Sequence, residues 1–208
     1  MRRKPPGQLL SSAHAIDREY QLIEALVSQD FPAARPLAYC KDDTVIGTAF
    51  YIMTHVEGRV FWEPSMPASN PAERRAVFRG MAQTLARLHS FDPQAIGLGT
   101  FGKAEGYIMR QVRRWSENYR LSATEDIGDM TRLMAWLPDH LPVSTRASIV
   151  HGDYRLDNLI IAPDTSDVSA VLDWELATIG DPIADLVYHL MTWICLLYTS
   201  DAADDTPC

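Results

Sequence analysis

Two short segments in the last third of the chain constrain its fold more than any other feature. One reads His-Gly-Asp-Tyr-Arg-Leu-Asp-Asn at 151–158, and the other reads Val-Leu-Asp-Trp-Glu at 171–175. Apolar residues at 159–161 and 168–172 predict two short strands. The run between them, at 162–167, is rich in turn-forming residues, so the sequence predicts a β-hairpin.

This hairpin is expected to bring three polar side chains together. Folded about Thr165 and Ser166, it pairs Asn158 with Asp173 at its open end, and Asp153 lies one loop upstream. An amide oxygen beside a carboxylate suits a hard cation such as Mg²⁺. A further carboxylate at the same place can accept a proton from a substrate hydroxyl. The spacing therefore predicts a site for metal-assisted acid–base chemistry.

A competing interpretation is a metallohydrolase that uses His151, Asp153 and Asp173. It is disfavoured because only one histidine lies near the carboxylates, and the sequence contains no H-x-x-x-H or Cys/His cluster. We expect His151 to hold the backbone of the loop rather than to act as a base.

The two polar segments and the hairpin between them resemble the catalytic and metal loops of the aminoglycoside phosphotransferase and choline kinase-like family. That family shares the protein-kinase fold. The resemblance covers about residues 1–194 and is closest to a subgroup associated with acyl-CoA dehydrogenases. The segments that carry the subgroup likeness are 3–7, 12–15, 106–112 and 180–182.

The resemblance implies roles for the residues of the two loops. Asp153 corresponds to the catalytic base, and Asn158 and Asp173 correspond to the ligands of Mg²⁺. Arg155, two residues after the base, is a candidate contact to the phosphates of ATP.

The N-terminal part supplies a second set of candidates through the same resemblance. Arg2 is expected to pair with Glu19 and to steady the phosphates of ATP, although Arg3 or Lys4 are alternatives for the cation. Without that pairing, Glu19 would lie on a solvated face of the helix predicted at 12–28.

The strand predicted at 46–58 leads, in the resembled fold, into the hinge between two lobes. There Met53 would abut adenine, while the Thr54 carbonyl and the Val56 N–H would bond its edge. The alternative is a plain core strand that ends in a loop, because backbone contacts leave no mark in a sequence.

Several helices are predicted from apolar residues at helical spacing. Their positions are 12–28, with Ser11 or Ser12 as N-cap, a helix that starts after the N-cap Asn70, 104–120, 129–141, and a buried helix at 186–198. Asp181 is expected to cap the last of these. Asp185 resembles the buried aspartate that holds the catalytic-loop backbone.

Bulk properties exclude some classes of function. A net charge of −8 over 208 residues argues against nucleic acid as a partner. Three cysteines without a pattern suit a reducing compartment, so a cytoplasmic location is expected. The apolar run at 186–198 is too short to cross a bilayer, and the basic residues at 1–4 precede no apolar signal core, so no membrane association is expected.

The expected fold class is α+β, a protein-kinase-like two-lobe fold with a truncated N-lobe. Residues 1–58 are expected to form a partial N-lobe and hinge without the first strands and the phosphate loop. Residues 59–194 would form a mainly helical C-lobe with the catalytic-loop β-hairpin. Residues 195–208 match nothing in the family and would be an aberrant or disordered tail, so the chain is interpreted as an internal fragment.

The expected function is ATP- and Mg²⁺-dependent phosphorylation of a small-molecule hydroxyl, for example on a hydroxyacyl compound or its CoA thioester. The subgroup also suggests a fused or associated acyl-CoA dehydrogenase as a partner. A nucleotide-binding pseudokinase or an inactive fragment is the alternative from a different class. An aminoglycoside or a choline-like amine is disfavoured as the acceptor.

Overall fold

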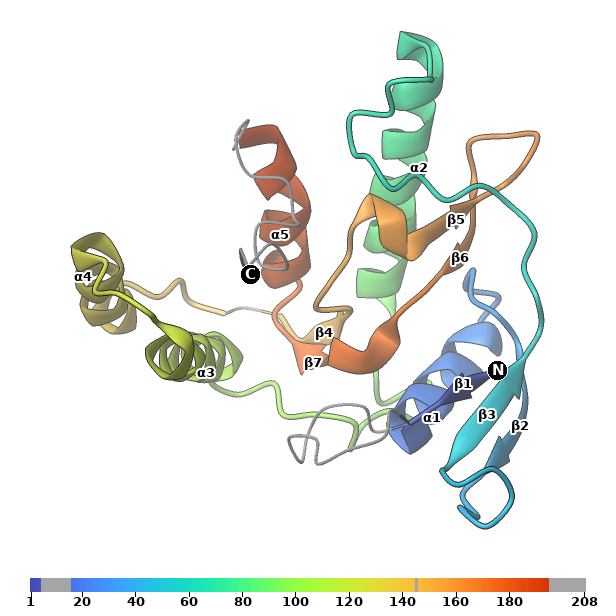
Figure 1. The fold of residues 1–208 in the computed structure, drawn as a ribbon, viewed down its shortest axis with the longest axis horizontal. Coiled ribbons are helices and arrows are strands. Elements are labelled where there is room, and N and C mark those ends of the chain that lie inside the picture. Colours follow the sequence, from blue (N-terminus) through green and yellow to red (C-terminus); the bar gives the residue numbers. More distant parts are fainter. Residues whose placement is uncertain (5–15, 145, 195–208) are drawn as a thin grey trace.

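A computed structural model describes residues 1–4, 16–144 and 146–194, which fold as helices packed around three small antiparallel sheets (Figure 1). In chain order the elements are β1 (Arg2–Arg3), α1 (Ile16–Val27), β2 (Pro36–Cys40), β3 (Phe50–Met53), α2 (Pro71–Ser90), α3 (Tyr107–Ser122), α4 (Gly128–Trp136), β4 (Ser148–Val150), β5 (Leu159–Ile161), β6 (Val168–Val171), β7 (Thr178–Gly180) and α5 (Ile183–Ile194). Short 3₁₀ helices at Leu137–Asp139, Leu156–Asn158 and Trp174–Leu176 complete the list.

The N-terminal part is a three-stranded sheet in the order β1-β3-β2, with α1 packed against it. The apolar face of α1 is buried, and the ring of Tyr20 lies 6.0 Å from that of Tyr51 on β3. The helix predicted at 12–28 is confirmed from Ile16 onward, whereas its predicted N-cap lies outside the described residues.

The strand predicted at 46–58 is wrong at both ends, because β3 covers only Phe50–Met53. Before it, the Gly47 N–H donates to the Asp43 carbonyl at 2.8 Å and closes a turn in which Gly47 has a positive φ. After it, the chain leaves the sheet, and Arg59 forms an isolated bridge with Ile161.

The helix predicted after Asn70 is confirmed as α2. Its N-cap side chain accepts a hydrogen bond from the Glu73 N–H at 2.9 Å. The four apolar residues expected on its inner face are all buried, and they are Val77, Met81, Leu85 and Leu88. This helix forms the centre of the larger part of the core.

The predicted hairpin exists as β5 and β6, but its register is shifted by one residue from the expected one. Leu159 pairs with Val171, and an irregularity follows between Ile160 and Ile161. The Leu172 N–H therefore donates to the Asn158 carbonyl, at 2.8 Å. Next to the turn, where Ile161 pairs with Val168, the register differs from the expected one by two positions, and the extra residue of the bulge in β6 reduces this difference to one. Asp173 consequently lies one position beyond the residue opposite Asn158.

The hairpin is also bonded to segments from the first third of the chain. The Val171 N–H donates to the Pro32 carbonyl at 2.9 Å, and Arg59 and Ile161 exchange two backbone hydrogen bonds of 2.7 and 2.9 Å. The predicted division at residue 58 stays a prediction. The predicted tail at 195–208 lies outside the described residues.

Helices α3 and α4 pack side by side and extend away from the rest of the molecule (Figure 1). The helix predicted at 129–141 ends at Trp136, where the chain tightens into a 3₁₀ helix that contains Pro138. Among the described residues, no helix is long and apolar enough to span a membrane.

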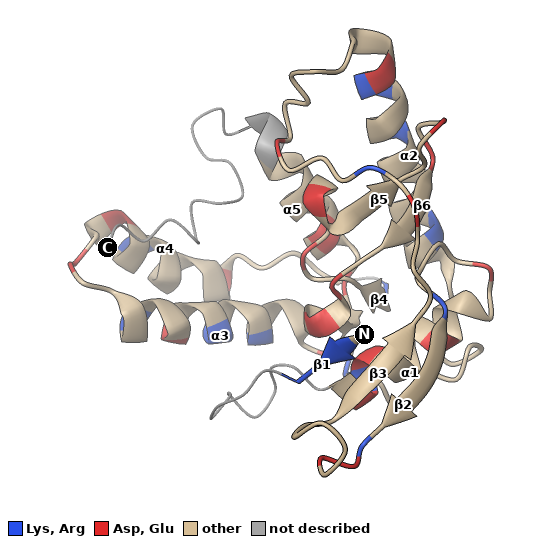
Figure 2. Cartoon of the chain, turned by 45° about the vertical axis from the view of Figure 1, so that its right-hand side comes forward, with Lys and Arg blue, Asp and Glu red and all other residues tan. Residues whose placement is uncertain are grey.

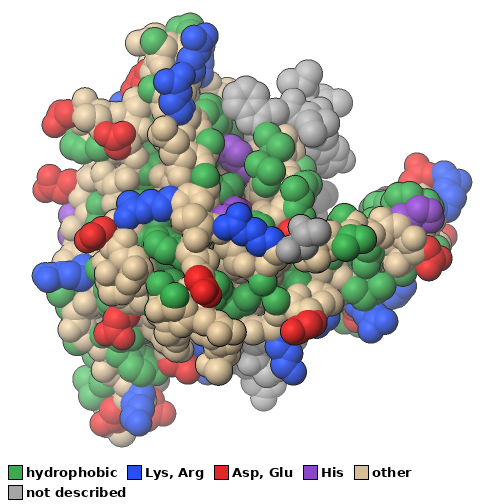
Figure 3. All heavy atoms as spheres, turned by 180° about the vertical axis from the view of Figure 1, so that it is seen from behind, with side chains coloured by type: hydrophobic (Ala, Val, Ile, Leu, Met, Phe, Trp, Pro, Cys, Tyr) green, Lys and Arg blue, Asp and Glu red, His purple; other side chains and the backbone are tan. Residues whose placement is uncertain are grey.

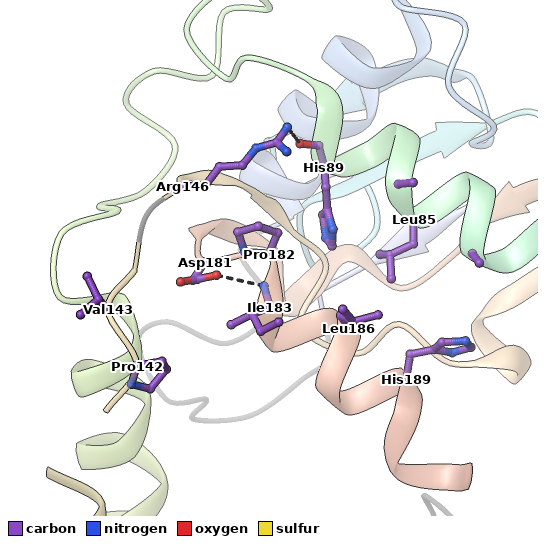
Figure 4. A pocket seen from close by; sticks show the side chains of 12 residues that line it. Leu85, His89, Pro142, Val143, Arg146, Asp181, Pro182, Ile183, Leu186 and His189 are labelled. Atoms are coloured by element: carbon purple, nitrogen blue, oxygen red, sulfur yellow. Dashed lines mark hydrogen bonds between the residues drawn. The ribbon is translucent and has the colours of Figure 1, made fainter. Parts of the chain in front are cut away.

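The last helix, α5, was expected to be buried, but one of its sides is exposed. Asp185 is buried, whereas Leu186, Val187, Leu190 and Met191 are exposed to between 41 and 54%. Its start is fixed as predicted, since the Ile183 N–H donates to the Asp181 side chain at 3.0 Å (Figure 4). A mainly apolar cavity of about 580 Å³ lies between α2 and α5, where apolar side chains also reach the surface (Figures 3 and 4).

Candidate active site

One buried carboxylate on α5 holds the backbone of the loop at 151–155. Asp185 is 1% exposed, and its Oδ2 and Oδ1 accept hydrogen bonds from the N–H groups of His151 and Gly152, each at 2.8 Å. The Nε2 of His89, at the end of α2, lies 3.0 Å from the same Oδ2. The expectation that Asp185 holds the loop backbone is confirmed.

Gly152 is required at its position for two reasons. Its φ is +86°, a conformation that other residues adopt at a cost. A Cβ added there would also lie 2.9 Å from the Leu176 Cβ and 3.0 Å from the Leu176 carbonyl oxygen. The glycine thus lets the loop at 151–155 approach the 3₁₀ helix Trp174–Leu176 closely.

His151 is a structural link between the two loops, as expected. Burial lowers its pKa, so the ring is neutral. Its Nδ1 accepts from the Asp153 N–H at 3.2 Å, which leaves the proton on Nε2, and that Nε2 lies 2.8 Å from the Leu172 carbonyl. Because the Leu172 N–H bonds to Asn158, both backbone groups of Leu172 connect the loops.

The structure brings Asp153 and Asn158 into direct contact. The Nδ2 of Asn158 donates to the Asp153 Oδ2 at 2.7 Å and to the Asp153 carbonyl at 2.9 Å. Two acceptors on this side fix the orientation of the amide, so that its oxygen is directed away from Asp153. That oxygen is therefore free to act as a ligand. The other carboxylate oxygen, Oδ1, accepts from the hydroxyl of Tyr188 at 2.8 Å.

Asp173 precedes the 3₁₀ helix Trp174–Leu176 and has a left-handed backbone conformation, φ 59° and ψ 65°. Aspartate and asparagine tolerate this conformation better than most residues. The side chain is partly exposed, and its Oδ1 lies 2.9 Å from Arg2. A carboxylate and an amide oxygen fit Mg²⁺, which commonly takes one or two protein ligands and completes its shell with phosphates and water.

Arg2 is the cation that pairs with Glu19, as the resemblance implies. Its Nε lies 3.1 Å from Glu19, and its Nη2 reaches Asp173 and, at 3.1 Å, Glu175. Figure 2 shows the basic strand β1 beside acidic segments of the C-terminal half. Glu19 is 5% exposed, and burial raises its pKa, an effect that Arg2 opposes. The helix-face alternative for Glu19 is therefore wrong.

The remaining candidate residues, which were assigned to ATP binding from the sequence, lie beside Asp153 and at the end of β3. Arg155 lies next to the base, with Nε 4.0 Å from the Asp153 carboxylate and Nη2 2.6 Å from Asp157. Met53, Thr54 and Val56 are half-buried where the chain leaves β3, and the Thr54 N–H donates to the Arg35 carbonyl at 2.9 Å. No described contact joins these three residues to the loops that carry Asp153 and Asp173.

Two residues at this site were not found by sequence reasoning. Glu175 could have been suspected, because it is acidic and stands two positions after Asp173 in a 3₁₀ helix. Tyr188 leaves a weaker signal, which is its position one helical turn after Asp185 on α5.

Replacement of Arg2 by Met is expected to lower the free energy of unfolding by about 2 kcal/mol, because Glu19 then loses its buried counter-charge. The loss should be larger at about pH 8 than at about pH 5. Without Arg2, burial holds the pKa of Glu19 further above its value in the unfolded chain. The protonated carboxyl then favours the folded state at low pH, and this contribution disappears as the pH rises.

Urea unfolding at both pH values measures this difference. Arg3→Met is the matched control, since Arg3 is the exposed neighbour in the same strand. An equal loss in the two variants, or a loss independent of pH, would contradict the buried ion pair.

The fold is kinase-like, and comparison with known proteins identifies the family. A model of the phosphotransferase enzyme family, APH, matches residues 1–203. The chain belongs to this family.

The similar curated proteins are acyl-CoA dehydrogenase family members that contain this region. Family member 10 of Mus musculus is 48% identical over 198 residues, which are 95% of this chain and 18% of that protein. Family member 11 of Gallus gallus is 48% identical over 189 residues, or 90% of this chain and 24% of that protein. The chain thus spans about a fifth to a quarter of the length of these relatives.

Solved structures show the same fold. A candidate aminoglycoside phosphotransferase of Ralstonia eutropha is 51% identical with a TM-score of 0.83, covering 87% of this chain and 56% of that one. The phosphotransferase APH(3'')-Id of Streptomyces rimosus, in complex with ADP and streptomycin, has a TM-score of 0.64 at 23% identity and covers 92% of this chain and 71% of that one. The second likeness supports the kinase-like fold alone.

Proposed function

We propose that this chain transfers the γ-phosphoryl group of ATP to a hydroxyl of a small molecule, with Mg²⁺ as the metal. One observation carries the proposal: Asp153 and Asn158 are in direct contact, and hydrogen bonds through Leu172 hold their loop to the segment in which Asp173 follows. In such reactions the metal neutralises the charge on the phosphates.

Each residue of the site has a role in this proposal. Asp153 orients the acceptor hydroxyl and takes its proton, while its carboxylate is held by Asn158. Asn158 and Asp173 provide oxygen ligands for Mg²⁺. Arg2, steadied by Glu19, and Arg155 lie near these carboxylates as cations that can hold phosphate oxygens.

We place the adenine of ATP at the end of β3. There Met53 would contact the base, and the backbone of Thr54 and Val56 would bond its edge. The half-buried position of all three residues supports this assignment, since an aromatic base needs an apolar contact together with free backbone groups.

We further propose a hydroxyacyl compound, free or as its CoA thioester, as the acceptor. The support is the similarity to members of the acyl-CoA dehydrogenase family, in which this region accompanies a dehydrogenase. A dehydrogenase, fused or associated, would then act on an acyl substrate related to the acceptor.

The test is a panel assay. The protein is incubated with Mg²⁺ and ATP and with hydroxy acids, hydroxyacyl-CoA thioesters, an aminoglycoside and choline, and phosphorylated products are identified by mass spectrometry. Phosphorylation of a hydroxyacyl compound supports the proposal. Binding of ATP without transfer to any acceptor would instead indicate a pseudokinase.

The variant Asp173→Asn is expected to weaken Mg²⁺-dependent ATP binding by about tenfold, because it removes the charge of the one charged residue among the two proposed metal ligands. Asparagine tolerates the left-handed backbone at this position, whereas alanine would add strain. Calorimetric titration with ATP, with and without Mg²⁺, measures the effect. Equal Mg²⁺ dependence in both proteins would remove Asp173 from the metal site.

A further inference from the structure

Helix α5 directs polar side chains toward the catalytic loop and apolar ones outward. Asp185 is buried and Tyr188 is half-buried, while Leu186 and Val187 are exposed to 41 and 54%. Asp185 and Tyr188 are three residues apart, so they lie on the same face of the helix. One helix face therefore supplies two separate hydrogen-bonding groups to a single loop.

These two side chains act on different parts of the loop. Asp185 binds the backbone N–H groups of His151 and Gly152, whereas the Tyr188 hydroxyl donates to the side chain of Asp153 at 2.8 Å. The phenol keeps its proton, since burial and the hydrogen bond to Asp153 raise its pKa to about 12. A protonated phenol beside a carboxylate is an unambiguous donor.

We infer that Tyr188 is a positioning residue for the phosphoryl transfer proposed above, on which this inference rests, and that its hydroxyl fixes the orientation of the Asp153 carboxylate. Tyr188 holds Oδ1 and Asn158 holds Oδ2, at 2.8 and 2.7 Å, so rotation of the carboxylate would break both hydrogen bonds. Each oxygen retains a second lone pair for the acceptor hydroxyl.

Arg155 is a competing partner of Asp153, and it also interacts with the Tyr188 hydroxyl. Its Nε lies 4.0 Å from the same Oδ1 that Tyr188 holds. Without the phenol hydroxyl, rotation of the carboxylate toward Arg155 would form a closer ion pair and turn the base away from the acceptor. Such a rotation would lower the rate of phosphoryl transfer even though the substrates still bind, because transfer depends on the orientation of the base.

The first part of the test needs no activity. In protein labelled with ¹³C at the tyrosine Cζ, the Tyr188 signal is assigned by its loss in Tyr188→Phe. This signal is expected to shift in Asp153→Asn, because the charged partner of the phenol is removed, while the Tyr119 signal stays unchanged. A Tyr188 signal with the same chemical shift in Asp153→Asn as in the wild type would overturn the inference.

The second part measures the hydrolysis of Mg-ATP, with water as the acceptor. Tyr188→Phe is expected to lower kcat by about tenfold, with KM for ATP changed by less than about twofold. Tyr119→Phe is the matched control, because its hydroxyl is buried on α3 without a hydrogen-bond partner among the described residues. The unfolding midpoint of each variant shows whether the protein folds.

The outcomes separate this inference from the proposed function. A wild-type protein that neither hydrolyses ATP nor phosphorylates any acceptor would overturn both. An active wild type with an equally active Tyr188→Phe variant would overturn the inference alone. A loss in kcat with KM unchanged, together with the Asp153-dependent signal, supports it.

Discussion

Asp185→Ala is expected to lower the free energy of unfolding by about 4 kcal/mol. The substitution removes the acceptor of two backbone N–H groups, the buried one of His151 and the partly buried one of Gly152, and the partner of His89. Each buried donor left without a partner costs about 1–3 kcal/mol. Urea unfolding measures the change, and the catalytic loop should become the most accessible part of the variant to amide hydrogen exchange.

Asp181→Ala is the matched control for that measurement. The same substitution four residues earlier removes only the cap of α5, a hydrogen bond of 3.0 Å to the Ile183 N–H, and should cost about 1 kcal/mol. If the two variants lost similar stability, Asp185 would not be the group that holds the loop.

Asp153→Asn is expected to lower the rate of phosphoryl transfer by about a thousandfold, since asparagine has the same shape but cannot accept the acceptor's proton. Mg-ATP should still bind nearly as tightly, because the proposed metal ligands Asn158 and Asp173 remain. Single-turnover transfer and calorimetric titration measure these two quantities separately. Asp164→Asn, the same change at an exposed position in the turn of the hairpin, should leave both unchanged.

The main parts of the site follow from the sequence because they are local. Asp153, Asn158 and Asp173 lie within one loop and one hairpin, so their proximity depends on a short stretch of chain. The register was still wrong by one residue, because the turn is not centred on Thr165 and Ser166, and the irregularity between Ile160 and Ile161 makes up only part of the difference. The ion pair of Arg2 with Glu19 was expected only through the family resemblance.

Contacts between distant segments could not be predicted in the same way. The hydrogen bond from Tyr188 joins residues 35 positions apart, and only the resemblance of Asp185 to a loop-holding aspartate indicates which face of α5 meets the loop. The apolar run that begins at Leu186 predicted a buried helix, yet the structure buries Asp185 instead. The side that a helix turns inward is decided by tertiary packing, which outweighs the average hydropathy of the segment.

The most direct test of the account compares phosphate transfer by the wild-type protein and by Asp153→Asn, with Mg-ATP as donor and a hydroxyacyl-CoA as acceptor, followed by ³¹P NMR. The account predicts a phosphate ester on the acceptor that requires Mg²⁺ and is absent for the variant, although both proteins bind Mg-ATP. Equal product from both proteins would contradict the role of Asp153, and a wild type that binds Mg-ATP but transfers phosphate to no acceptor would contradict the proposed activity.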